Sequence, residues 1–142
     1  MSRWKGRVLA LEALYAWEAA KHPPQELLSF PWVEDEKLRM MSDADLAFPR
    51  ALIAGAIENI AVIDKKIRSS IKNWDFSRLK RVDLAILRLG AYSLMFQKDI
   101  PSSVTIEEAV KLSIEYGVDD SFRFVNGVLD SISKSCAEPA TR

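Results

Sequence analysis

The chain is poor in the residues that build covalent or metal-dependent sites. Its 142 residues include a single cysteine, Cys136, and a single histidine, His22. One cysteine excludes a disulfide within the chain and a cysteine-rich metal site, so we interpret Cys136 as a packing or surface thiol. His22 stands beside two prolines, and its neighbourhood lacks the partners that a metal or general-base site needs. It is interpreted as a loop residue.

Catalytic patterns are also missing. The five glycines are too scattered for a loop that cradles phosphate. The acidic pairs Glu107–Glu108 and Asp119–Asp120 stand where helices are expected to begin, and capping and the helix dipole account for them. The sequence therefore predicts a protein that is not an enzyme and has no cofactor and no metal.

Long apolar runs and net charge are absent as well. Charged residues interrupt every apolar run well before the roughly 20 residues that a membrane span requires, and no signal-peptide pattern follows the charged start. We expect a soluble, cytoplasmic protein with no membrane partner. Twenty basic residues balance twenty acidic ones, so any binding of nucleic acid must use a local patch and should be modest without help.

What the sequence does have is helical periodicity almost throughout, which predicts an all-α fold of about six to seven helices. At 49% apolar residues, one compact domain over residues 1–136 is expected, followed by a flexible tail over 137–142. The apolar stripe of the first helix is predicted to contain Trp4, Val8, Leu11 and Tyr15. The main helices are expected at 3–20, 43–70, 78–98, 104–116 and 120–134, with at most a short one near 25–29.

Several residues are predicted to define the ends of these helices. Phe30 and Trp32 should pin the proline-containing segment 23–41 to the core. Ser42 or Asp43, Ser77 and Asp119 are predicted N-caps, and Gly117 a left-handed C-cap. The helix from 78 to 98 is apolar around so much of its circumference that it should be the most buried.

One aromatic residue does not fit the helical pattern. In the last helix, Phe124 points about 200° away from Phe122, toward the side that should face water. The apolar stripe of that helix contains Val118, Phe122, Val125, Leu129 and Ile132. An exposed ring of this kind can stack on an unpaired base.

Basic residues gather in three places. Arg3, Lys5 and Arg7 occur without an acid in the first seven residues, and Arg123 adjoins Phe124. On the helix from 78, three arginines fall within about 80° of arc and are predicted to form an exposed strip: Arg78, Arg81 and Arg88. A solvated surface is the simpler interpretation of each cluster, and phosphate binding is the alternative.

These segments resemble the NusB family of bacterial transcription antitermination factors. The resemblance spans nearly the whole chain and is strongest in "ALEALYAWE" (10–18), "NWDFSRLKRVDLAILRLGAYSLMF" (73–96), "DIPSSVTIEEAVKLSIEYG" (99–117) and "DDSFRFVNGVLDSI" (119–132). It implies two packed helical subdomains. It also implies binding of single-stranded boxA RNA in nascent ribosomal RNA leaders, jointly with the ribosomal protein NusE, in an antitermination complex with RNA polymerase and other Nus factors.

The resemblance also implies roles for particular residues. RNA contacts are implied for the N-terminal arm, Arg3, Lys5 and Arg7, and for the ring of Phe124. Trp4 and Gly6 depart from the usual pattern of that arm, which could weaken RNA binding or let Trp4 stack on a base. Asp120, Arg123 and Asn126 lie beside Phe124, and the basic strip adds Arg88 to the predicted RNA-binding set. Tyr15 and Asp83 match the NusE-binding surface, although Tyr15 also fits the apolar stripe of its helix.

Two alternatives remain open. NusB-like domains also precede the catalytic domain of certain ribosomal RNA cytosine methyltransferases, so the chain could be an accessory RNA-binding domain. It could instead be a protein-only helical scaffold that forms a homodimer through an apolar patch of Phe124 and Val128.

Overall fold

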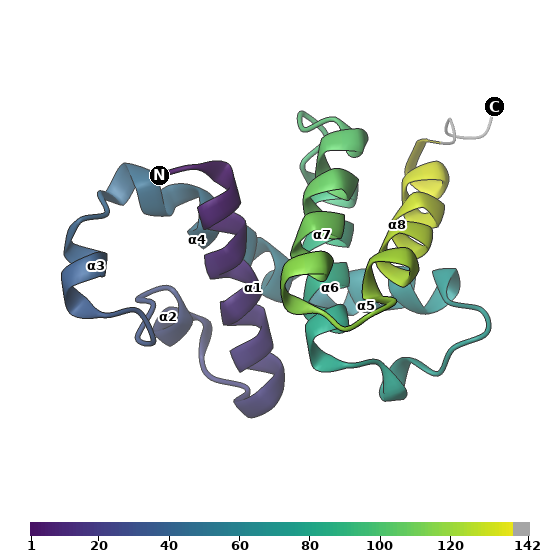
Figure 1. Ribbon diagram of the computed structural model, residues 1–142, viewed down its shortest axis with the longest axis horizontal. Helices are drawn as coiled ribbons and strands as arrows, with labels where there is room; N and C mark the ends of the chain where they lie inside the picture. The colour runs from purple at the N-terminus through teal and green to yellow at the C-terminus, as the bar shows by residue number, and fades with distance from the viewer. Residues whose placement is uncertain (138–142) are drawn as a thin grey trace. The chain divides into compact units, whose positions relative to one another are not determined.

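The computed structural model describes residues 1–137, and all regular structure in that range is helical (Figure 1). The predicted all-α fold is confirmed. The tail predicted for residues 137–142 lies, apart from Ala137, outside the described residues. The helices of the described range are α1 (Arg3–Ala20), α2 (Pro24–Leu27), α3 (Asp35–Arg39), α4 (Asp43–Glu58), α5 (Ile60–Ser70), the 3₁₀ turn η1 (Phe76–Arg78), α6 (Arg81–Phe96), α7 (Ser102–Tyr116) and α8 (Ser121–Ala137).

Two α-helices were not anticipated. The stretch predicted as one helix over 43–70 is interrupted at Asn59, whose φ of −107° and ψ of 20° leave the helical region. The short helix α3 lies in the segment predicted to be irregular. No single helix of the described range is long and apolar enough to cross a membrane, and α4 and α5 reach that threshold only as a broken pair.

The chain divides into two compact units, Met1–Glu58 and Asn59–Arg142. In the first unit α1 packs on α4, and α2 also contacts α4. Phe30 is fully buried, and the Trp32 Nε1–H donates a hydrogen bond to Glu12 Oε1 at 3.1 Å. These two residues pin the connection between α1 and α4, as predicted.

The buried face of α1 differs from the predicted stripe. Trp4 and Val8 are half-buried, and Tyr15 is 40% exposed. Of that stripe only Leu11 is buried. Small residues share the packed face with leucines, because small residues let the backbones of two helices approach closely. The buried residues of α1 are Gly6, Arg7, Leu9, Ala10, Leu11, Ala13 and Leu14.

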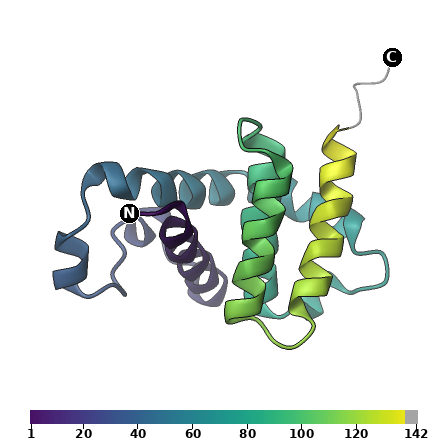
Figure 2. The same cartoon turned by 45° about the horizontal axis from the view of Figure 1, so that its top comes forward.

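In the second unit α6 is surrounded by three other helices, α5, α7 and α8 (Figures 1 and 2). Every residue from Leu84 to Ala91 is buried, which confirms α6 as the most buried helix. A Cβ atom on Gly90 would lie 2.6 Å from Leu129 Cδ1. A side chain at position 90 would therefore displace the fully buried Leu129 from its place between α6 and α8.

Some predicted helix ends are confirmed and others are wrong. Ser42 caps α4 through its Oγ, which accepts a hydrogen bond from the Asp45 N–H at 3.0 Å. Ser77 is not the cap of α6, because its N–H and hydroxyl donate to Asp75 and α6 begins only at Arg81. Likewise, α8 begins at Ser121, one residue later than a cap at Asp119 would give.

Gly117 ends α7 in an extended conformation, with φ −88° and ψ −167°, and not in the predicted left-handed one. Glycine is nevertheless required by space. A Cβ atom there would lie 2.6 Å from the Ser113 carbonyl oxygen and 2.7 Å from Ser121 Cβ. The turn between α7 and α8 is therefore too tight for a side chain.

Candidate nucleic-acid interface

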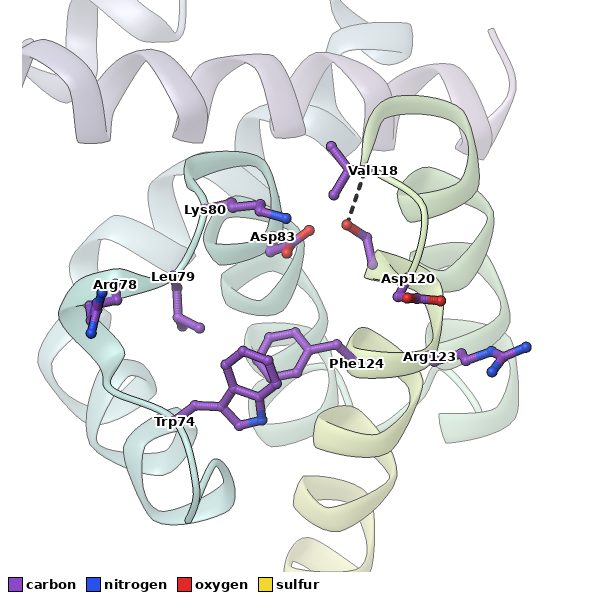
Figure 3. Close-up of a pocket in the computed structure, with 10 residues that line it drawn as sticks. Trp74, Arg78, Leu79, Lys80, Asp83, Val118, Asp120, Arg123 and Phe124 are labelled. Carbon is purple, nitrogen blue, oxygen red and sulfur yellow. Dashed lines mark hydrogen bonds between the residues drawn. The ribbon is translucent and has the colours of Figure 1, made fainter.

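A groove of about 430 Å³ opens in the second unit between the segment that follows α5 and the start of α8 (Figure 3). Its most prominent feature is a pair of aromatic rings, Trp74 and Phe124. Their ring centroids are 5.0 Å apart, and the ring planes are inclined by 58°. Trp74 is 63% exposed, and Phe124 is half-buried.

The amphipathic pattern of α8 accounts for the position of Phe124. Val125, Leu129 and Ile132 are buried as predicted, and Val128 joins them, whereas Phe122 of the predicted stripe is only half-buried. Val118, in contrast, precedes the helix and is exposed. Phe124 lies at the edge of the buried face, so its ring is neither in the core nor fully in water, and one part of it contacts Trp74.

Hydrogen bonds hold the two segments that carry the rings. At the start of α8, the Val118 N–H donates to the buried Ser121 Oγ at 3.0 Å, drawn as a dashed line in Figure 3. Directly after Trp74, the Asp75 carboxylate accepts from the Ser77 hydroxyl at 2.7 Å and from the Ser77 N–H at 3.0 Å. These two bonds lower the pKa of Asp75 and fix the turn beside the tryptophan.

The rim of the groove is basic. Arg78, Lys80 and Arg123 line it and are exposed. Figure 3 shows Arg78 and Arg123 on opposite sides of the ring pair. Two acidic residues, Asp83 and Asp120, also line it. The two aromatic side chains can stack on a planar ring of a bound molecule. The basic residues at the rim can pair with negatively charged groups of the same molecule.

Asp83 has an unsatisfied hydrogen-bonding atom. The residue is only 7% exposed, and its buried Oδ1 accepts no hydrogen bond in the structure. A buried acceptor without a partner is costly. A donor supplied by a bound molecule would satisfy this oxygen.

Of the predicted site residues, the structure brings four together in this groove: Asp83, Asp120, Arg123 and Phe124. Asn126 is exposed on α8 but does not line the groove. Trp74 is not among the predicted site residues, because the pattern of "NWDFSRL" indicates only a turn. A tryptophan inside a polar turn was the available signal, since a large apolar ring in such a place needs something to contact.

Arg88 does not lie on an exposed strip, so that prediction is wrong. Its side chain is 4% exposed, and two hydrogen bonds of 2.9 Å join its Nε and Nη2 to the Asp64 carboxylate on α5. Arg78 and Arg81 are exposed, but they precede or begin α6. At Arg88, the side of α6 that was predicted to face solvent is covered by α5.

The basic residues of the first unit are partly engaged by α4. The guanidinium of Arg3 lies 4.1 Å from the centroid of the Phe48 ring and that of Arg7 lies 5.2 Å from it. Arg7 is buried, whereas Arg3 and Lys5 are exposed. The departure at Gly6 has a structural reason, since a Cβ there would lie 2.8 Å from Phe48 Cδ2.

Two further predictions can be checked from exposure. Tyr15 is exposed rather than part of the core, so its side chain is accessible at the surface of α1. The patch predicted to close a homodimer is wrong in its second residue, because Val128 is buried in the core beside Leu129.

Comparisons with known proteins agree on one family. Residues 5–134 match the NusB family. The transcription antitermination protein NusB of Treponema pallidum (strain Nichols) is 50% identical over 135 residues, which cover 95% of this chain and 94% of that protein. T. maritima NusB has a solved structure that is 34% identical, with a TM-score of 0.81, covering 94% of this chain and 92% of that one.

A chain from the crystal structure of antitermination factors NusB and NusE in complex with dsRNA is 30% identical. Its TM-score is 0.81, and the match covers 95% of this chain and 99% of that chain. The prediction that the chain is not an enzyme accords with relatives that are named as transcription antitermination proteins. The resemblance seen in the sequence is confirmed, and the chain belongs to the NusB family.

Proposed function

We propose that the chain is a non-catalytic antitermination factor that binds single-stranded boxA RNA of nascent ribosomal RNA leaders jointly with NusE. The observation that carries this proposal is the Trp74–Phe124 ring pair in a groove with a basic rim. Rings of this kind stack on unpaired bases, and arginine and lysine side chains pair with phosphates. A relative of similar fold has been crystallised with NusE and dsRNA.

Charge limits how tightly the chain can bind RNA alone. Arg78, Lys80 and Arg123 at the groove, with Arg3 and Lys5 of the first unit, offer about 3–5 phosphate contacts. For single strands this gives a salt slope of roughly −2 to −4. Binding should therefore be weak at physiological salt. A second protein that extends the RNA contact would raise the affinity by linkage.

Asp83 supports the requirement for a partner. Its buried, unpartnered Oδ1 belongs to the same groove as Phe124, and the family resemblance assigns this position to the NusE surface. A hydrogen bond from the partner would satisfy this oxygen. RNA and partner would then meet at one groove. We extend the proposal to an antitermination complex with RNA polymerase and other Nus factors, in the cytoplasm, where nascent transcripts are made.

The proposal is tested by fluorescence anisotropy with a labelled single-stranded boxA RNA and a scrambled RNA of the same composition. Each is titrated with the chain alone, NusE alone and both proteins. We expect tight, sequence-dependent binding only with both proteins. No preference for boxA in any mixture would refute the proposed function.

Phe124→Ala isolates the stacking contact. It should weaken binding by about 1–3 kcal/mol, which is the cost of losing one stacked base. Phe96→Ala is the matched control, because Phe96 is also exposed in the second unit but stacks on Tyr92 and does not line the groove. Equal RNA affinity for the folded Phe124→Ala and Phe96→Ala proteins would refute the role of the ring.

A further inference from the structure

A second groove, of about 420 Å³, adjoins the first one and shares Trp74, Phe124 and Arg123 with it. Its walls are the segment from Ser70 to Trp74 on one side and α8 on the other. The α8 residues that line it are Arg123, Phe124, Gly127, Val128 and Ser131. The ring pair therefore borders both grooves.

The charge of this second groove differs from that of the first. Among the described residues that line it, Lys72 and Arg123 are basic and none is acidic. The first groove, in contrast, contains the two carboxylates Asp83 and Asp120. A polyanion is therefore more favoured in the second groove than in the first.

Gly127 is an exposed residue of α8 at the border of the second groove. A Cβ atom at this position would meet nothing within 4 Å, so the packing of α8 does not demand glycine. Its φ is not positive either. Glycine within a helix is less favourable than alanine, and here neither packing nor backbone geometry explains it. The space at this position, on the border of the groove, is open.

We propose that this second groove binds the next nucleotide of the same RNA strand, across the ring pair from the nucleotide in the first groove. This inference rests on the proposed function. The base packs against the Trp74–Phe124 pair over Gly127, and the phosphate lies near Lys72 and Arg123. Trp74 then contacts two consecutive nucleotides, and the single-stranded site is one nucleotide longer than the first groove provides.

Gly127→Leu tests this inference without removing any contact of the fold. Leucine is a good helix former, and the position is open, so the variant should fold and melt at or above the wild-type temperature. Its side chain adds bulk at the border of the second groove. Ala61→Leu is the matched control, since Ala61 is exposed on α5 of the same unit and lines neither groove.

The assay is anisotropy with labelled boxA RNA in the presence of NusE. We expect Gly127→Leu to weaken binding about 5- to 150-fold, the range for losing one stacked base, and Ala61→Leu to leave it unchanged. Lys72→Gln should weaken binding and reduce the magnitude of the salt slope by about 0.7, the value for one phosphate on a single strand.

A series of the same RNA, shortened by one nucleotide at a time from each end, gives the second measurement. The shortest RNA that retains full affinity should be one nucleotide shorter for Gly127→Leu than for the wild type. If Gly127→Leu binds like the wild type while Phe124→Ala is weakened, the second groove is not used and the proposed function stands. If the wild type binds no boxA RNA, both proposals fall.

Discussion

The buried ion pair between Arg88 and Asp64 allows a decisive experiment on the role of Arg88. A helical projection suggested RNA binding, whereas the structure gives this arginine a partner on α5. The two interpretations predict opposite effects of Arg88→Met. If Arg88 supports the fold, the variant loses stability and keeps its RNA affinity. If Arg88 binds phosphate, the reverse is expected.

The magnitude follows from burial. The side chains of Arg88 and Asp64 are 4% and 14% exposed, and the pair is bidentate. Removing one partner of a buried pair costs about 3–5 kcal/mol, because the other charge stays in a poorly solvated place. Since Asp64 retains some contact with water, we expect a loss of about 3 kcal/mol for Arg88→Met, which leaves that carboxylate without its partner. For a chain of this size, that loss lowers the melting temperature by roughly 10 °C.

The assay combines urea denaturation with RNA titration on four proteins: wild type, Asp64→Leu, Arg88→Met and the double variant. Both single variants should lose stability. The double variant should recover most of the loss, since no charge is left without its counterion. RNA affinity should stay within about twofold of wild type in every folded variant, because the Arg88 side chain is buried against Asp64 and does not reach RNA. A twofold change in affinity corresponds to about 0.4 kcal/mol, which is less than a phosphate contact contributes. An Arg88→Met protein of wild-type stability with weakened RNA binding would refute this reasoning.

Two further predictions concern the turns that hold the groove. Gly117→Ala should destabilise the fold by about 1–3 kcal/mol in urea, because its Cβ would lie 2.6 Å from the Ser113 carbonyl oxygen and 2.7 Å from Ser121 Cβ; an unchanged midpoint would contradict the tight turn. The pKa of Asp75 lies below its ordinary value of 3.8 because Ser77 donates two hydrogen bonds to the carboxylate, so the resulting stabilisation is fully present above pH 3.8 and is lost as the pH falls through the lowered pKa. Wild type should therefore be more stable than Asp75→Asn near neutral pH, with the gap closing in acid, and a gap independent of pH would show that the carboxylate charge is not responsible.

Local signals predicted most of the helices. Proline and glycine breakers bound Arg3–Ala20 and Ser102–Tyr116; the first helix has its predicted bounds, and the second begins two residues earlier than predicted and ends where expected. The errors arise where a helical projection was used to decide which side faces water. On α1 the predicted stripe is right at Leu11 and wrong at Tyr15, because other leucines and small residues make up the rest of the packed side. On α6 the side that carries Arg88 does not face solvent, because α5 packs against it.

By itself, the sequence determined the helical fold class, the family and the misfit of Phe124 with the apolar stripe of its helix. Each of these depends on residues close together in the chain or on matching short segments. The tertiary structure alone decided that Trp74 lies beside Phe124, that Arg88 forms an ion pair with Asp64, and that Gly127 borders a groove. Those contacts join residues far apart in the sequence, and no periodicity within one helix carries information about which distant segment packs against it.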